Sequence, residues 1–113
     1  MAGNGDCMLA ALKRYFGFDS FRPGQEEAVG AIISGRDVMA VMPTGGGKSV
    51  CYQLPAARPG TFTLVVTPLR ALMRDQVQHL RSHGIPAALI DSGLSDTERA
   101  AVYGRALSGE LRI

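Results

Sequence analysis

The spacing of hydrophobic residues along the chain predicts five helices. In the helices over residues 8–16, 25–34 and 69–83, apolar residues recur every three to four positions, and glycines 17, 35, 84 and 109 follow four of the five helices. The last helix starts at a capping box, Ser95 to Glu98, in which a serine and a glutamate three residues apart satisfy the first backbone amides. The predicted helices cover residues 8–16, 25–34, 48–57, 69–83 and 95–107.

Short apolar runs between these helices are typical of buried strands. The run 37–42 is almost continuously apolar, which favours a strand covered on both faces of a parallel sheet. Similar runs lie at residues 61–67, 87–90 and 111–113. Alternating strands and helices indicate repeated βαβ crossovers, so we expect an α/β fold with a flexible tail over residues 1–6. A strand that begins at residue 111 leads us to expect that residues 7–113 are the N-terminal part of a longer domain.

Composition narrows the class of protein. The 113 residues are 46% hydrophobic and 19% charged, as in a packed globular chain. A net charge of +2 is too small to indicate a nucleic-acid or membrane partner by itself. The apolar runs are far shorter than the roughly 18 residues of a membrane span, and the N-terminus lacks a secretory signal. Cys7 and Cys51 have no metal-site spacing and are expected to be reduced, so we expect a cytoplasmic protein.

A glycine-rich segment joins the first predicted strand to the third predicted helix. Its residues are Met42, Pro43, Thr44, Gly45, Gly46, Gly47, Lys48 and Ser49. Glycines let backbone amides converge on phosphate oxygens, and a helix N-terminus adds unpaired amides and partial positive charge. Lys48 would neutralise the β- and γ-phosphates, and the Ser49 hydroxyl would bind Mg²⁺. The strict pattern G-x-x-x-x-G-K-[ST] requires glycine at position 42, so a glycine-rich turn with an exposed lysine is the alternative.

Phe18, Arg22 and Gln25 form a second candidate group just before that segment. A glutamine amide matches the donor and acceptor at N6 and N7 of adenine, and Phe18 and Arg22 could stack on the two faces of the ring. The alternative is one aromatic core contact and two solvated polar side chains.

Several blocks, taken in order, resemble the start of a RecQ-type ATP-dependent DNA helicase of superfamily 2. They are residues 16–18, 21–26, 42–49, 51–55, 67–69, 72–73 and 75–77, within a resemblance that covers about residues 9–113. It implies the first RecA-like lobe of a P-loop NTPase, in which methionine at position 42 is usual. It further implies that Gln25 reads adenine between Phe18 and Arg22. Lys48 and Ser49 are then the catalytic contacts to ATP and Mg²⁺.

The same resemblance implies a motor that translocates 3′ to 5′ on single-stranded DNA and unwinds duplexes, branched DNA included, in recombination and repair. The residues expected to contact DNA are Thr67, Pro68, Leu69, Arg70 and Ser92. Hydroxyl and backbone N–H groups there can bind phosphates without reading bases. The family commonly has an uncharged residue at the position of Arg70, so the arginine here either makes no difference or is an extra phosphate contact. Arg70, Arg74 and Arg81 share one edge of the predicted helix 69–83, which we interpret as a solvated face.

Hydrolysis also needs groups that residues 1–113 do not contain. None of the ten acidic residues lies in the Asp-Glu-x-His motif of the family, so these residues alone are expected to hydrolyse ATP negligibly. Zinc, if the protein uses it, is expected only beyond Ile113. Three alternatives stay open: another superfamily 2 motor such as an RNA helicase, a small-molecule P-loop kinase, or a non-catalytic module that binds nucleotide or DNA.

Overall fold

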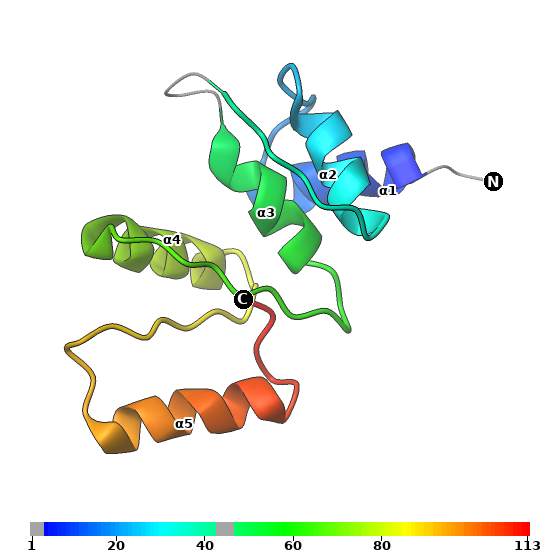
Figure 1. Ribbon diagram of the computed structural model, residues 1–113. Coiled ribbons are helices and arrows are strands. Elements are labelled where there is room, and N and C mark those ends of the chain that lie inside the picture. The colour runs from blue at the N-terminus through cyan, green and yellow to red at the C-terminus, as the bar shows by residue number, and fades with distance from the viewer. Residues whose placement is uncertain (1–3, 43–46) are drawn as a thin grey trace. The chain divides into compact units, whose positions relative to one another are not determined.

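The computed structural model describes residues 4–42 and 47–113, which form two compact units, Met1–Arg58 and Pro59–Ile113. Figure 1 shows helices joined by extended segments in both. The first unit contains α1 (Asn4–Ala11), the π-helical turn η1 (Leu12–Phe16), α2 (Gln25–Ile33) and α3 (Lys48–Ala56). The second contains α4 (Arg70–Ser82) and α5 (Asp96–Leu107). The five predicted helices are confirmed, with ends that differ by a few residues at most for α2 to α5.

The first predicted helix differs from expectation at both ends. It begins at Asn4, inside the segment expected as a tail, and it continues beyond Ala11 as a π-helical turn. Gly17 ends it with φ 74°, a conformation that glycine adopts without a Cβ clash, and its N–H donates to Lys13 O at 3.1 Å. The predicted glycine stop is therefore confirmed.

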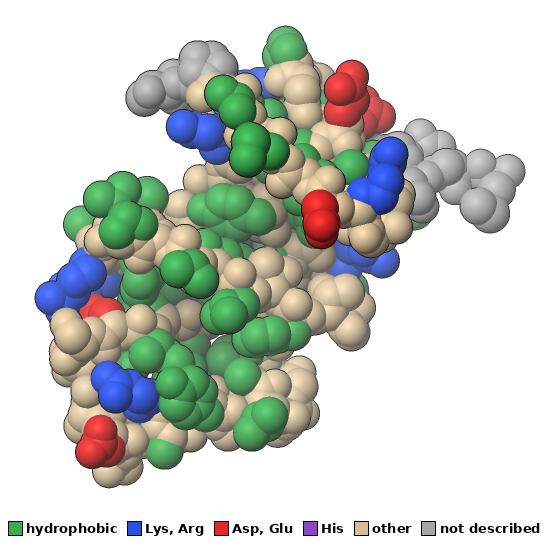
Figure 2. Space-filling view, viewed as in Figure 1, with side chains coloured by type: hydrophobic (Ala, Val, Ile, Leu, Met, Phe, Trp, Pro, Cys, Tyr) green, Lys and Arg blue, Asp and Glu red, His purple; other side chains and the backbone are tan. Residues whose placement is uncertain are grey.

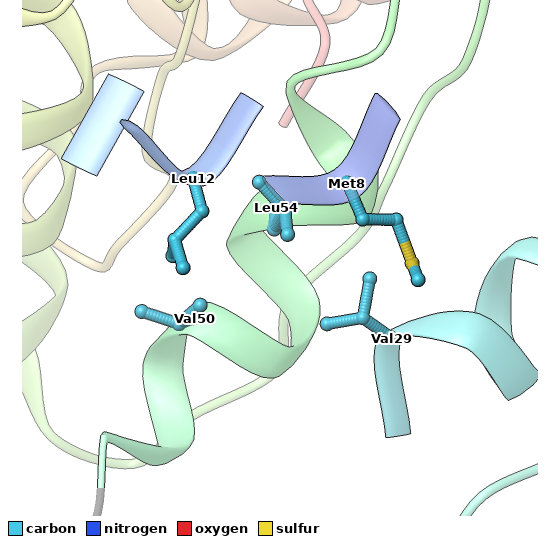
Figure 3. Packing of buried hydrophobic residues seen from close by; sticks show 5 residues of the cluster. All are labelled: Met8, Leu12, Val29, Val50 and Leu54. Atoms are coloured by element: carbon cyan, nitrogen blue, oxygen red, sulfur yellow. The ribbon is translucent and has the colours of Figure 1, made fainter. Parts of the chain in front are cut away.

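A hydrophobic cluster among the described residues holds the first unit together (Figure 3). Its buried members, drawn from α1, η1, α2 and α3, are Met8, Leu12, Val29, Val50 and Leu54. Leu12 and Val29 have no exposed surface, and partly buried residues such as Phe16 and Phe21 pack against the cluster. This core fixes α2 and α3 against each other, which matters because both candidate nucleotide-binding groups lie at the N-termini of these two helices.

Extended segments meet in the second unit through backbone hydrogen bonds. Thr63 N donates to Arg112 O at 2.8 Å, and Arg112 N donates to Pro86 O at 2.9 Å. Residues 111–113 therefore lie between the segments that start at Thr61 and at Ile85. Leu80, Ile85, Ala87 and Leu111 are buried residues of this unit.

The predicted strands are not formed. Residues 4–42 and 47–113 contain no strand, and Met39 and Val41 in the first predicted strand are 91% and 89% exposed. A continuously apolar strand needs a hydrogen-bonded neighbour and cover on both faces, and the described part of the chain supplies neither for residues 37–42. Residues 61–67 keep an extended backbone in which half-buried and exposed side chains alternate, the period of a strand without its ladder.

The second unit also leaves apolar surface uncovered. Leu69, the residue before α4, and Leu72 within it are 58% and 42% exposed, whereas Leu80 is buried. A cavity of about 570 Å³ lies among α4, α5 and the extended segments, with Leu64, Val102 and Leu111 in its lining. Figure 2 shows hydrophobic side chains exposed around these helices. Across the described residues, no helix is long and apolar enough to cross a membrane.

Candidate functional site

The N-terminus of α3 carries the end of the glycine-rich segment. Gly47 precedes the helix with φ 77° and ψ 35°, and Lys48 and Ser49 are its first two residues. Lys48 is exposed and Ser49 is partly buried, so both are near solvent at the helix start. Four of the predicted loop residues, Pro43, Thr44, Gly45 and Gly46, lie outside the described residues.

Gln25 connects the start of α2 to this helix start. Its side chain is only 3% exposed, its Oε1 accepts from Arg22 N at 2.8 Å, and its Nε2 donates to Gly47 O at 3.0 Å. A Cβ added at Gly47 would overlap the Gln25 amide and lie 3.6 Å from Arg22 Cδ. The glycine therefore permits a close approach that any larger residue would block.

The structure thus brings together two members of the predicted adenine-binding group and the phosphate-binding segment. Arg22 and Gln25 lie against Gly47, whereas Phe18 is 48% exposed. An amide group can make up to four hydrogen bonds, and with described residues Gln25 makes one as an acceptor and one as a donor. Reading of adenine by Gln25 stays a prediction.

Met42 has a packing role that the strict loop pattern does not reveal. A Cβ added at Gly24, the residue before α2, would lie 3.3 Å from Met42 Cε. The methionine side chain therefore lies against the turn that begins α2, and Gly24 itself has φ 85°. A glycine at position 42 could not reach this turn.

The residues predicted to contact DNA lie in the second unit. Thr67 Oγ1 accepts from Leu69 N at 3.3 Å, and Leu69 and Arg70 are exposed. Arg70 Nη2 lies 3.4 Å from Asp91 Oδ2, so the segment before α4 and the loop containing Ser92 come together. Thr67, Pro68, Leu69, Arg70 and Ser92 stay predicted DNA contacts.

Asp91 is a charged residue of this surface that the sequence analysis missed. Its Oδ1 accepts from Gly93 N at 2.9 Å, and Arg74 Nη2 lies 3.4 Å from its Oδ2. The Gly93 N–H group first, and then Arg70 and Arg74, hold the pKa of Asp91 below its usual value. An aspartate two residues before a glycine is a common turn signal, which predicts the contact with Gly93 but not the contacts with the two arginines.

The three arginines predicted to share one edge of α4 do not share one contact partner. Arg81 donates from Nε to Ala87 O at 2.8 Å and so ties the end of α4 to an extended segment, while Arg70 and Arg74 converge on Asp91. All three arginines are exposed, as a solvated face requires, but they do not all contact the same partner.

Both cysteines are free thiols, as expected. Cys7 is exposed and Cys51 is buried within α3. Burial raises the pKa of the Cys51 thiol, which keeps it protonated and unreactive.

A helix that starts with lysine and serine after a left-handed glycine, at the end of a glycine-rich segment, is a feature of the P-loop class of nucleotide-binding proteins. The chain belongs to the DEAD/DEAH box helicase family, whose sequence profile matches residues 22–108. This family has a RecA-like P-loop fold, so the expected fold class is supported at that level although the sheet is not seen in the described residues.

Individual relatives agree with the resemblance to RecQ-type helicases. The chain is 44% identical over 105 residues to the ATP-dependent DNA helicase RecQ of Haemophilus influenzae, covering 93% of this chain and 17% of the relative. It is 52% identical over 92 residues to the RecQ protein of Synechocystis, covering 81% and 19%. Identity to the RecQ-like DNA helicase BLM of Xenopus laevis is 45% over 96 residues, covering 85% and 7%. The chain therefore spans less than a fifth of the length of each of these relatives.

Proposed function

We propose that this chain supplies the ATP-binding loop and part of the DNA-binding surface of an ATP-dependent DNA helicase of the RecQ type. The observation that carries the proposal is the meeting of Gln25 and Gly47 at the start of α3, in a chain of the DEAD/DEAH box helicase family. The names of the similar proteins, which are DNA helicases, support DNA as the nucleic acid.

The residues present fit a nucleoside triphosphate. The missing Cβ of Gly47 lets the Gln25 amide approach the start of α3, and the partial positive charge of the α3 N-terminus favours an anion there. In this proposal Lys48 neutralises the phosphates, the Ser49 hydroxyl is a ligand of the Mg²⁺ that accompanies ATP, and Gln25 recognises adenine. Phe18 and Arg22 contact the faces of the adenine ring.

The second unit provides the proposed contacts to single-stranded DNA. Thr67, Leu69, Arg70 and Ser92 lie on segments that the Arg70–Asp91 ion pair joins. Contacts of this kind to phosphates are independent of sequence, as a motor that moves along any strand requires. Translocation from 3′ to 5′, unwinding of branched DNA and a role in recombination and repair belong to the proposal through the RecQ resemblance.

Turnover requires more than these residues. A carboxylate must orient the attacking water, and an arginine from a facing lobe commonly contributes about 10³- to 10⁵-fold in rate in P-loop NTPases. Residues 1–113 contain no Asp-Glu-x-His motif, so we expect negligible ATP hydrolysis by this chain alone.

Lys48→Ala tests the proposal in the complete gene product. Loss of a positioned cation from the phosphates should lower DNA-stimulated ATP hydrolysis by about 10²- to 10³-fold and abolish unwinding, with DNA binding retained. Lys13→Ala is a matched control, because Lys13 is the chain's other lysine and lies exposed on η1. The measurements are phosphate release and the unwinding of a duplex with a 3′ single-stranded tail.

Other results of the same assays would favour other functions. Equal stimulation by RNA and DNA would indicate a general superfamily 2 motor, and phosphate transfer to a small molecule would indicate a kinase. If Lys48→Ala leaves every activity of the gene product unchanged, the chain is a non-catalytic binding module. Unwinding only from 5′ tails would contradict the proposed polarity.

A further inference from the structure

Asp91, Arg70 and Arg74 form a charged cluster in the second unit, which we name the Asp91 cluster. Asp91 Oδ2 lies 3.4 Å from Nη2 of each arginine, and its Oδ1 accepts from Gly93 N at 2.9 Å. A Cβ added at Gly93 would lie 3.3 Å from Arg70 Nη2, so the loop backbone also borders the guanidinium. One carboxylate thus joins two helical residues, one turn apart, to the loop that precedes α5.

The positions of the two arginines are unfavourable for α4 by itself. Arg70 is the first residue of the helix, where the partial positive charge of the helix N-terminus disfavours a cation, and the first turn contains no acidic residue. Arg74 lies four residues later, a spacing at which like charges repel. Asp91 supplies the negative charge that allows both guanidinium groups to stay at this end of the helix.

The cluster presents its positive groups to solvent and covers its negative one. The Asp91 side chain is 5% exposed, whereas those of Arg70 and Arg74 are 54% and 63% exposed. Each guanidinium has five N–H donors, and the contact with Asp91 involves one nitrogen of each. Figure 2 shows basic and acidic side chains together near α4.

Two positive groups and one negative group leave the cluster one positive charge, which one phosphodiester would neutralise. Planar guanidinium groups bind phosphate oxygens through paired hydrogen bonds. Ser92, next to Asp91 in the chain, is exposed and carries a hydroxyl group that can donate a hydrogen bond.

We propose that Asp91 is a positioning residue, which holds Arg70 and Arg74 as a pair that binds one backbone phosphate of single-stranded DNA. The inference rests on the proposed function and assigns a role to a residue that does not itself contact DNA. The expected direction of the change in DNA affinity is unusual. Removing this negative charge should weaken DNA binding, whereas a simple charge effect would strengthen it.

Asp91→Asn in the complete gene product tests this prediction, because asparagine keeps an acceptor for Gly93 N and removes the charge. The probe is an unstructured oligodeoxythymidine, measured by fluorescence anisotropy at several salt concentrations without nucleotide. Affinity should fall severalfold, and the slope of log K against log salt should decrease in magnitude by about 0.7 for each phosphate that the protein no longer binds. Asp96→Asn is the matched control, because the Asp96 side chain is fully exposed and pairs with Arg99 on α5 at 3.9 Å.

The same substitution in an Arg70→Ala, Arg74→Ala background separates positioning from a general effect on the fold. If Asp91 acts through these arginines, Asp91→Asn should change neither affinity nor salt slope in that background. A further decrease in affinity there would show a structural role for Asp91 and overturn the inference. Tighter binding, or no change, when Asp91→Asn alone is introduced would overturn it as well. If the unaltered protein fails to bind the oligonucleotide, the proposed function itself falls, and the inference with it.

Discussion

A Cβ at Gly47 is disfavoured for two reasons. Its φ of 77° disfavours residues with a Cβ, and that Cβ would also overlap the Gln25 amide. The sequence identified this glycine through the loop pattern. It did not reveal that the crowding comes from Gln25, which lies 22 positions earlier in the chain.

Gly47→Ala is therefore expected to weaken nucleotide binding by tenfold or more, because the Gln25 side chain must leave Gly47 O. Gly35→Ala is the control, since Gly35 has φ 83° but nothing within 4 Å of an added Cβ. Both variants carry a left-handed strain of about 1–2 kcal/mol, and only Gly47→Ala adds the overlap. Titration with a fluorescent ATP analogue measures the difference, and equal affinity in the two variants would contradict this account.

Asp91 shows the limit of residue-level prediction. Its neighbour Ser92 was predicted to contact DNA, but the aspartate itself was not singled out. Its importance depends on Arg70, 21 positions away, and on Arg74 one helical turn further along. No local pattern contains that pairing.

Among the elements, α5 agrees most closely with its local signals. Ser95 Oγ accepts from Glu98 N at 3.1 Å, and Glu98 Oε1 accepts from Ser95 N at 3.1 Å, so the predicted capping box is confirmed. Both contacts join residues three positions apart, which explains why the sequence alone was sufficient. The π-helical turn of η1 was missed, because Leu9, Leu12 and Phe16 satisfy the ordinary helical spacing equally well.

The cap of α5 predicts a pH dependence. The hydrogen bond from Ser95 N–H lowers the pKa of Glu98, so its ionised form favours the folded state. This stabilisation is complete above the unfolded-state pKa and is lost as pH falls through the lower folded-state value, below about pH 4. Glu98→Gln keeps the acceptor but does not titrate. The stability difference between wild type and Glu98→Gln, measured by urea denaturation, should shrink between pH 7 and pH 3, and a pH-independent difference would contradict the prediction.

At the scale of the whole molecule, the hydrophobic cluster of the first unit is expected to determine the stability of that unit. Leu54 is 1% exposed and packs in the cluster with Leu12 and Val29. Figure 3 shows these side chains converging between the helices. The cluster joins α1, η1, α2 and α3, so disrupting it would also release the approach of Gln25 to Gly47.

Leu54→Ala should lower the free energy of unfolding by about 2–5 kcal/mol, because it removes a buried side chain and leaves a cavity. Leu107→Ala makes the same change at a site that is 89% exposed, and its effect should stay within about 0.5 kcal/mol. Urea denaturation followed by circular dichroism measures both. Similar decreases in the two variants would show that the cluster does not determine stability.

The sequence by itself determined the helices, the capping box, the glycine stops and the chemical character of the phosphate-binding segment. These features depend on hydrogen bonds and side-chain spacings within a few residues, so local order is enough to specify them. Only the tertiary structure decided that Gln25 meets Gly47, that Arg70 and Arg74 share Asp91, and that the apolar runs of the described residues form no strand ladder. A strand ladder or a long-range ion pair needs a partner from elsewhere in the chain, and its geometry exists only once the helices have packed.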